Sequence, residues 1–202
     1  INLSATFHRQ NNLDYNYGMR SAIDDGYISD YIINIEYFSD GDRLNVLCDM
    51  IKDNLSWSPT LIYFNTTEKC IKLNKLLLEN NIKSGYITGD TSSSKKKEIK
   101  DKVNNKTLNI VCLCGCWNEG ISINNIQTVI FGDLRHSQIN KIQIVMRANR
   151  LSDDKPYYRI VLPLQEKDLK NKNVSDIIKT FSQIDSKIEN AIKNKSNTRI
   201  KI

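Results

Sequence analysis

The sequence predicts an α/β fold in which a parallel β-sheet is covered by helices on both faces. From about residue 32 to residue 164, short continuous apolar runs alternate with longer amphipathic stretches. Continuous apolar runs are typical of strands buried on both faces, and right-handed crossovers between them give a doubly wound sheet. Gly and Pro are scarce, at eight and three residues, so the breaks between elements fall at clusters of Asn, Asp, Ser and Thr.

Each element is expected from its own pattern. The first strand, 31–37 (YIINIEY), is rich in β-branched and aromatic residues, and a helix is expected after it over 42–54. The apolar run TLIYF at 60–64 precedes a stretch, 68–80, with leucines at helical spacing. The other strands are expected at 84–88, 108–114, 128–131 and 157–162, and the other helices in a polar stretch ending at 103 and at 138–150.

After Pro163 the pattern changes to one long amphipathic helix, in which apolar residues recur every three or four positions. They are Val174, Ile177, Ile178, Phe181, Ile184, Ile188 and Ile192. We expect this face to pack on its own domain or on a domain outside the chain, with a coiled-coil partner as the alternative. Residues 165–202 carry nine Lys/Arg against five Asp/Glu, so +4 of the total charge of +6 lies here. This basic excess favours a polyanionic partner, or it marks a solvated Lys-rich helix.

Five cysteines occur, and three of them alternate at Cys112, Cys114 and Cys116. On a strand, this spacing places all three on one face. Zinc sites use wider gaps between ligands, and no His or second Cys pair is placed to complete four ligands. The sequence therefore predicts reduced thiols that pack as small apolar groups, and no metal site.

The sequence shows no signal for secretion or for insertion into a membrane. It begins at Ile1 rather than Met, from which we expect a piece of a longer polypeptide. The first residues lack a secretory pattern, and no apolar run has the length that spans a bilayer. We therefore expect an intracellular protein with no membrane partner.

The residues that directly follow each strand carry most of the chemistry, because ligands of open α/β sheets bind at the carboxyl ends of the strands. After 60–64, Asn65 and Glu68 have the spacing of a capping box, and the same helix start offers N–H groups to a phosphate. The strand at 84–88 ends at Thr88, and Gly89 follows it. Hydroxyl residues then lead into a Lys-rich helix, a pattern that suits contacts to a nucleic-acid backbone. After 108–114, two glycines in the segment 114–122 mark a sharp bend or a close approach to a ligand.

A last motif lies in the helix expected at 138–150. Gln143, Arg147 and Arg150 are separated by four and three residues, which places all three side chains on one helical face. Two adjacent guanidiniums repel each other unless an anion or carboxylates lie between them. Arg is suited to stabilising charge on a transferring phosphoryl group, although surface ion pairs with Asp153 or Asp154 would give the same pattern.

In their order and spacing these motifs resemble the C-terminal half of superfamily II helicases and translocases of the DEAD/DEAH kind. The resemblance runs from residue 3 to about residue 163. It rests on Leu3-Ser4-Ala5-Thr6 (the Ser-Ala-Thr motif), Ala22–Tyr31 (the segment between lobes), Leu61–Thr66 (motif IV), Val111–Ser122 (motif V) and Gln143–Arg150 (motif VI), with Ser137 before the last helix. It implies the end of a first motor lobe and an interlobe linker at 1–31, a RecA-like domain at 32–164 and a basic helical tail at 165–202.

The resemblance also implies roles for single residues. Arg150 is expected to be the arginine finger and Arg147 a γ-phosphate contact, with Gln143 aligning both. Gly120 and Ser122 are expected near the ribose of the nucleotide. The residues expected to face the nucleic-acid backbone are Asn65, Thr66, Thr88, Gly89, Cys114 and Gly115.

The sequence departs from the family pattern at three places. Met146 stands where Gly usually precedes the first arginine, Cys114-Gly115 replaces Thr-Asp, and Ser122 replaces Asp. The second change removes a hydroxyl and a carboxylate from the loop that couples the two ligand sites. Glu119 before Gly120, and the acidic-Gly-aromatic segment between lobes, are more similar to branches found in large DNA viruses and restriction-type translocases than to RNA-unwinding DEAD-box proteins.

The sequence contains no G-x-x-x-x-G-K-[ST] motif, and no acidic Walker-B strand precedes Ser4. Phosphoryl transfer needs such a Lys and Mg²⁺ cradle, so we expect no ATP hydrolysis by this chain alone. The expected whole is an ATP-dependent helicase in which a first RecA-like lobe binds most of the ATP and Mg²⁺ and the partner is DNA or RNA. It is expected in the cytoplasm or nucleus of a host, or in a virion if it is viral.

Two other functions remain open from the sequence. A degenerate helicase lobe could serve as a nucleic-acid-binding scaffold without ATPase activity, as the changes in motif V suggest. An unrelated doubly wound enzyme, such as a nucleotide-sugar transferase, is the second alternative. A P-loop and an acidic box upstream of residue 1 would distinguish the first function from both alternatives.

Overall fold

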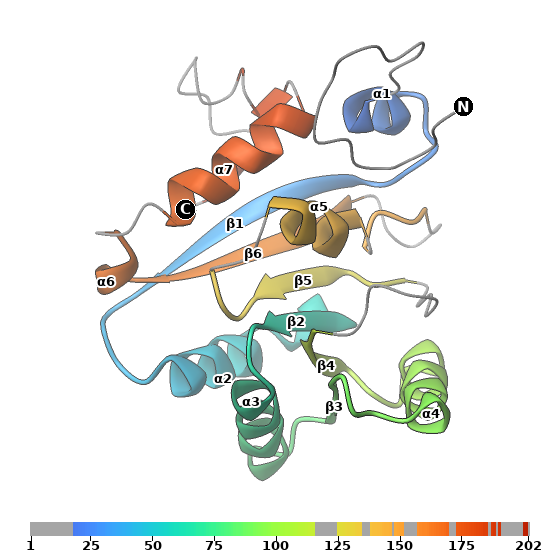
Figure 1. The fold of residues 1–202 in the computed structure, drawn as a ribbon, viewed down its shortest axis with the longest axis vertical. Helices are drawn as coiled ribbons and strands as arrows, with labels where there is room; N and C mark the ends of the chain where they lie inside the picture. Colours follow the sequence, from blue (N-terminus) through green and yellow to red (C-terminus); the bar gives the residue numbers. More distant parts are fainter. Residues whose placement is uncertain are drawn as a thin grey trace.

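The part of the chain that the structure describes forms one parallel sheet of seven strands in the order β3-β4-β2-β5-β6-β1-β7. A computed structural model describes residues 18–115, 125–134, 138–146, 148–151, 157–169, 173–185, 187–188, 190 and 200–201. The strands are β1 (Asp30–Phe38), β2 (Thr60–Phe64), β3 (Ser84–Ile87), β4 (Ile110–Cys114), β5 (Thr128–Phe131), β6 (Tyr157–Gln165) and β7 (Ile200–Lys201). Every pairing is parallel, and Figure 1 shows the sheet with helices on both sides. The predicted doubly wound α/β fold is confirmed.

The helices connect the strands in the order the sequence predicts. They are α1 (Met19–Asp24), α2 (Arg43–Asp53), α3 (Thr67–Glu79), α4 (Ser93–Asn104), α5 (Gln138–Met146), α6 (Glu166–Leu169) and α7 (Asn173–Ile184), with a short 3₁₀ turn η1 (Leu55–Trp57) after α2. Asp42, Thr66 and Ser92 cap α2, α3 and α4 through side-chain oxygens that accept backbone N–H groups. The prediction of Asn65 as the cap of α3 is wrong by one residue, because Thr66 is the last extended residue before the helix.

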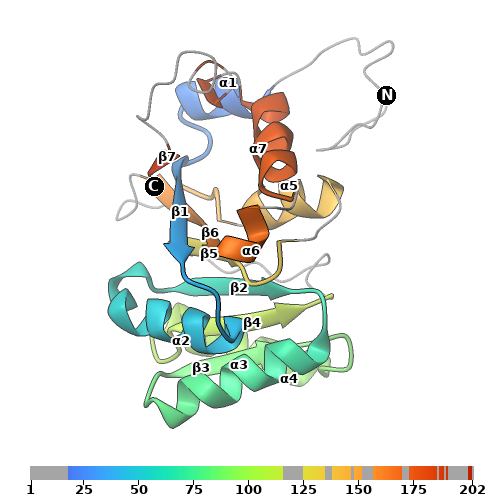
Figure 2. The same ribbon diagram turned by 90° about the vertical axis from the view of Figure 1, so that its left-hand side faces the viewer.

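Successive side chains of the central strands enter two different apolar cores. In β2, Leu61 belongs to a core with α1, α4, α5 and α7, whereas Ile62 and Phe64 belong to a core with α2 and α3. Alternation of this kind, with both sets of side chains buried, explains why these strands are continuously apolar. Figure 2 shows α5 and α7 side by side on one side of the sheet.

Cys112 and Cys114 lie on the same face of β4, in the core with α2 and α3. Cys48, Cys70, Cys112 and Cys114 are buried and carry thiol side chains. Burial, with a smaller contribution from Cys70, raises the pKa of the Cys112 thiol well above its usual value. These four thiols pack as small apolar groups, and Cys116 lies outside the described residues.

Two helices end sooner than the sequence predicts. The helix expected over 138–150 ends at Met146. The Ala148 N–H donates to the Val145 carbonyl, three residues back, which is a turn rather than a continuing α-helix, and Ser29 donates to the carbonyls of Asn149 and Arg150. The long helix expected after Pro163 ends as α7 at Ile184, because the Asp185 carboxylate accepts the Lys187 N–H and starts a new turn.

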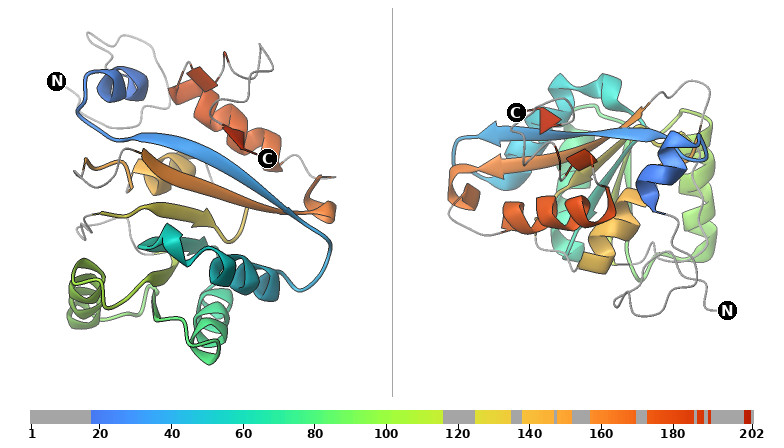
Figure 3. Two further views of the ribbon diagram at one scale, coloured as in Figure 1. Left: turned by 180° about the vertical axis from the view of Figure 1, so that it is seen from behind. Right: turned by 90° about the horizontal axis from the view of Figure 1, so that it is seen from above.

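The segments on either side of the sheet domain pack into its core. Met19 and Ile23 from α1, and Ile177, Phe181 and Ile188 from α7 and the turn after it, are buried in the same core as β1 and β6. From behind, Figure 3 shows β1 and β6 running side by side as the longest strands, with α1 and α7 beyond β1. Neither α1 nor β7 was expected from the sequence. In the described part of the chain, no helix has the length and apolar character needed to cross a membrane.

Candidate functional site

The expected nucleic-acid residues lie in one row at one edge of the sheet. They follow β2, β3 and β4, and these strands are neighbours in the order β3-β4-β2. Because all three are parallel, their carboxyl ends open on the same edge, with Phe64 paired to Cys114 and Ile87 to Leu113. The fold therefore brings together three loops that are far apart in sequence, and we call them the track edge.

The loop after β2 exposes Asn65 and Thr66. The Asn65 N–H donates to Asp133 Oδ2 over 2.9 Å, and Lys69 Nζ lies 2.6 Å from Asp133 Oδ1. Asp133 is almost buried, whereas Lys69 is half-exposed. One carboxylate from the end of β5 thus fixes the start of α3 and holds an ammonium group at the track edge.

Asp133 and Lys69 are missed by the sequence reasoning, although one signal for Asp133 was present. It follows the apolar run 128–131 by two residues, and this is the position at which an open sheet presents polar groups. Lys69 gives no such signal, because a Lys in the first turn of a helix is most often a solvated residue.

The loop after β3 differs from the expectation in one respect. Thr88 is buried, and its N–H donates to Thr91 Oγ1 over 2.9 Å. Gly89 and Asp90, which follow, are exposed. Thr88 therefore holds the turn in shape, and Gly89 is the residue of this pair that a ligand can approach.

The loop after β4 begins with a turn that favours glycine. Gly115 has a φ of +71°, a conformation that side chains with a Cβ rarely adopt, and it is exposed. Cys114 is almost buried, and its sulfur accepts a hydrogen bond from Thr67 Oγ1 over 3.8 Å. Gly120 and Ser122, expected near the ribose, lie outside the described residues.

Of the two expected arginines, Arg150 lies near the opposite edge of the sheet, where β1 and β6 begin. Gln143 is half-buried on α5, Arg150 is exposed four residues after the end of α5, and Arg147 lies outside the described residues. Since α5 ends at Met146, the prediction that Gln143 and Arg150 share one helical face is wrong. Ser29 holds the backbone of Arg150 instead, with its Oγ donating to the Arg150 carbonyl over 2.9 Å.

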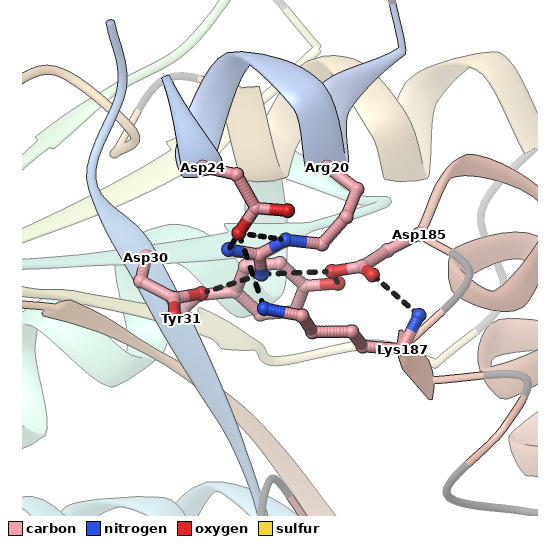
Figure 4. Close-up of polar contacts among 6 residues, drawn as sticks. All are labelled: Arg20, Asp24, Asp30, Tyr31, Asp185 and Lys187. Atoms are coloured by element: carbon pink, nitrogen blue, oxygen red, sulfur yellow. Dashed lines mark hydrogen bonds and ion pairs between the residues drawn. The ribbon is translucent and has the colours of Figure 1, made fainter. Parts of the chain in front are cut away.

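Beside this edge lies a second polar feature that the sequence did not suggest. Arg20 on α1 contacts Asp24, Asp30 and the fully buried Asp185, and Figure 4 shows these side chains converging with Tyr31 and Lys187. Tyr31 Oη donates to Asp185 Oδ2 over 2.9 Å. We call these six residues the Arg20 cluster.

The charges of the cluster shift the pKa values of its members. Hydrogen bonds from Arg20 and then Lys187 lower the pKa of Asp24 from 3.8 to about 2. The neighbouring Tyr158 is fully buried, and burial, followed by the charges of Asp30 and Asp185, raises the pKa of its phenol well above its usual value.

The fold and the two edges define the class of the protein as the C-terminal lobe of a superfamily II helicase. Residues 42–152, just over half of the chain, match the family described as "Helicase conserved C-terminal domain". The chain belongs to this family.

Sequence relatives and solved structures agree with this assignment. The ATP-dependent RNA helicase FAL1 of Mycosarcoma maydis is 27% identical over 108 residues, which cover 54% of this chain and 27% of that protein. The fold is similar to the C-terminal domain of the DEAD-box protein Dbp5, with a TM-score of 0.62 at 16% identity over 79% of this chain and 88% of that one. It is also similar to the DNA-bound ATP-dependent Type ISP restriction-modification enzyme LlaBIII, with a TM-score of 0.74 at 19% identity over 93% of this chain and 16% of that one.

The chain spans less than a third of the length of the curated relatives it matches. The matched curated relatives are fungal proteins, and the matches give no support to the expectation of a viral origin.

Proposed function

We propose that this chain is the second motor lobe of an ATP-dependent helicase or translocase and that it acts together with a first RecA-like lobe. The observation that supports this proposal most is the placement of its two sets of polar residues. The track edge presents exposed loop backbone and a Lys, whereas the opposite edge presents an exposed Arg on a fixed backbone. Motif V begins in β4, whose carboxyl end forms part of the track edge, and it would link this edge to the proposed nucleotide side.

At the opposite edge, Arg150 and Arg147 would contact the β- and γ-phosphates of ATP from across the gap between lobes. Their guanidiniums would stabilise the charge on the phosphoryl oxygens as the bond to the leaving group breaks. Gln143, Gly120 and Ser122 complete the proposed nucleotide side of this lobe. Mg²⁺ would neutralise phosphate charge, and residues outside this chain would bind it, since the sequence contains no P-loop motif with its Ser or Thr and no Walker-B carboxylate.

At the track edge, Asn65, Thr66, Gly89 and Gly115 would donate N–H or side-chain groups to backbone phosphates. Thr88 and Cys114 would support these loops from below rather than contact the ligand, because both are nearly buried. The relatives include proteins named RNA helicases and a structural neighbour bound to DNA, so both nucleic acids belong in the test.

A scaffold without ATPase activity is the second candidate, favoured by one observation. Cys114-Gly115 supplies neither the hydroxyl nor the carboxylate usual in the coupling loop, and the Cys114 sulfur is occupied by Thr67. In such a protein the track edge would bind nucleic acid while ATP turnover was absent.

The test is nucleic-acid-stimulated ATPase activity of a protein that contains both lobes, measured with single-stranded DNA and with single-stranded RNA. Arg150→Lys keeps the charge but loses the planar fork, and turnover should fall on the order of a thousandfold while nucleotide affinity changes little. Lys75→Ala, at an exposed position on α3, is the control and should keep wild-type turnover. Turnover near wild type in Arg150→Lys would refute the proposed role, and no turnover in the wild type would favour the scaffold.

A further inference from the structure

Residues 18–31, which include the stretch Ala22–Tyr31 expected to lead from one lobe to the other, pack against the rest of this lobe. Met19 and Ile23 of α1 are buried in the core. Arg20 contacts Asp24 on its own helix, Asp30 at the start of β1 and Asp185 after α7. As Figure 4 shows, α1, β1 and the turn after α7 converge on this one guanidinium.

The end of α1 has a defined geometry that determines where the next residues lie. Tyr27 N–H donates to the Ala22 carbonyl over 2.9 Å, and Gly26 N–H donates to the Ile23 carbonyl over 3.0 Å. With Gly26 at a φ of +77°, this is a Schellman motif, in which a left-handed residue closes the helix. The chain therefore turns back at a fixed angle and delivers Ser29 to the end of α5.

Ser29 makes two hydrogen bonds to successive carbonyls. Its N–H donates to the Asn149 carbonyl over 2.7 Å, and its Oγ donates to the Arg150 carbonyl over 2.9 Å. Ser29 and Asn149 are buried, whereas Arg150 is exposed. The side chain of Arg150 is thus free to reach a ligand, while its backbone is held by a residue 121 positions earlier in the chain.

We propose that Ser29 is a positioning residue for Arg150, so that the segment between lobes controls how the arginine finger is presented. This inference rests on the proposed function of Arg150. The helix that carries motif VI ends at Met146, so helical hydrogen bonds do not hold Arg150. An arginine finger must lie within a few tenths of an ångström of its productive position to stabilise the transition state. Ser29 supplies that constraint, and the Arg20 cluster anchors the segment that carries Ser29.

The test uses Ser29→Ala in the protein that contains both lobes. This change removes the Oγ bond to Arg150 and keeps the backbone bond to Asn149. The kcat of stimulated ATPase should fall about tenfold, since small displacements of catalytic groups have effects of this order or larger. KM for ATP should stay within about twofold, because the lost interaction acts in the transition state. Ser21→Ala, at an exposed serine on α1, is the matched control and should behave as wild type.

A double-mutant cycle separates positioning from a general effect on the fold. If Ser29 acts through Arg150, adding Ser29→Ala to Arg150→Lys should cause little further loss. Two results would overturn the role of Ser29 while leaving the proposed function intact. One is a double variant whose loss of kcat equals the product of the two single losses, and the other is a wild-type kcat in Ser29→Ala. Wild-type turnover in Arg150→Lys would overturn the proposed function and, with it, this role of Ser29.

Discussion

The two faces of the sheet are held in different ways. On the face of α2 and α3, fully buried Leu47, Ile62, Leu73, Leu77 and Cys112 pack against one another. On the face of α1, α5 and α7, a similar apolar core carries a charged cluster at its margin, where Arg20 meets the fully buried Asp185. The ion pairs of α2 and α3, Arg43–Asp168 and Lys69–Asp133, are partly exposed, whereas the second face has a fully buried carboxylate at its margin.

The difference indicates that apolar packing provides most of the stability of the lobe, whereas the polar margin determines how its segments are positioned. An apolar face is stabilised in proportion to the area it buries and needs no exact partner. A buried carboxylate contributes little net stability, but it requires its donors to be in place. The polar margin therefore specifies where α1, β1 and the turn after α7 lie relative to one another, and it lies beside the segment that reaches Arg150.

The largest stability effect is expected on the apolar face. Leu73 is fully buried in α3, and Leu73→Ala should lower the free energy of unfolding by about 3 to 4 kcal/mol through lost burial and a cavity. Leu78 lies on the same helix but is more than half exposed, so Leu78→Ala should change the free energy of unfolding by less than about 0.5 kcal/mol. Urea denaturation of the three proteins measures both values, and equal losses would contradict the assigned faces.

A somewhat smaller effect is expected at the polar margin. Arg20→Met leaves the buried Asp185 carboxylate without its cation, and this should cost about 2 to 3 kcal/mol, because Tyr31 and the Lys187 N–H still donate to it. Replacing both partners, in Arg20→Met with Asp185→Leu, should restore most of the loss. Lys75→Met, at an exposed ion pair on α3, is the control and should change the free energy of unfolding by less than about 0.5 kcal/mol. Failure of the double variant to recover stability would show that the margin stabilises the lobe rather than specifying its geometry.

The smallest effect is a dependence on pH at Asp24. Its pKa is lowered from 3.8 to about 2 by hydrogen bonds from Arg20 and Lys187. A carboxyl whose folded pKa is lowered stabilises the fold above its ordinary pKa, and this contribution is lost as pH falls toward the folded value. The Tm advantage of wild type over Asp24→Asn should therefore be constant between pH 7 and pH 5 and shrink below about pH 4. An advantage that does not change with pH would exclude this ionisation as its source.

The contrast between apolar packing and polar contacts also explains how much of the fold could be predicted from the sequence. The strands at 60–64 and 128–131 lie where the sequence places them, because burial on both faces makes them continuously apolar. The end of α5 could not be predicted, since helical spacing continues past Met146, and the contact of Ser29 with the backbone after the helix joins residues far apart in the chain. The two-residue β7 is too short to give a pattern.

The residues of the candidate site also divide into those that the sequence could predict and those that it could not. Asn65, Gly89 and Gly115 could be proposed from their positions after strands, and the order of the strands places them along one edge. Asp133 satisfied the same rule and was overlooked. Arg20 and Asp24 have the spacing of a helical ion pair, but the Arg20 cluster could not be found, because its buried member Asp185 lies 165 positions after Arg20 in the chain. Spacing along one helix or strand contains no information about such a contact.

The central claim is that Arg150 stabilises the transition state of ATP hydrolysis rather than the bound ATP. The most direct measurement compares the affinities of wild type and Arg150→Lys, in the protein with both lobes and nucleic acid, for two ligands. One is a non-hydrolysable ATP analogue, and the other is ADP with aluminium fluoride and Mg²⁺, which mimics the phosphoryl group in transfer. The account predicts that wild type prefers the mimic by on the order of a hundredfold and that Arg150→Lys loses most of this preference while binding the analogue normally. An equal preference in both proteins would contradict it.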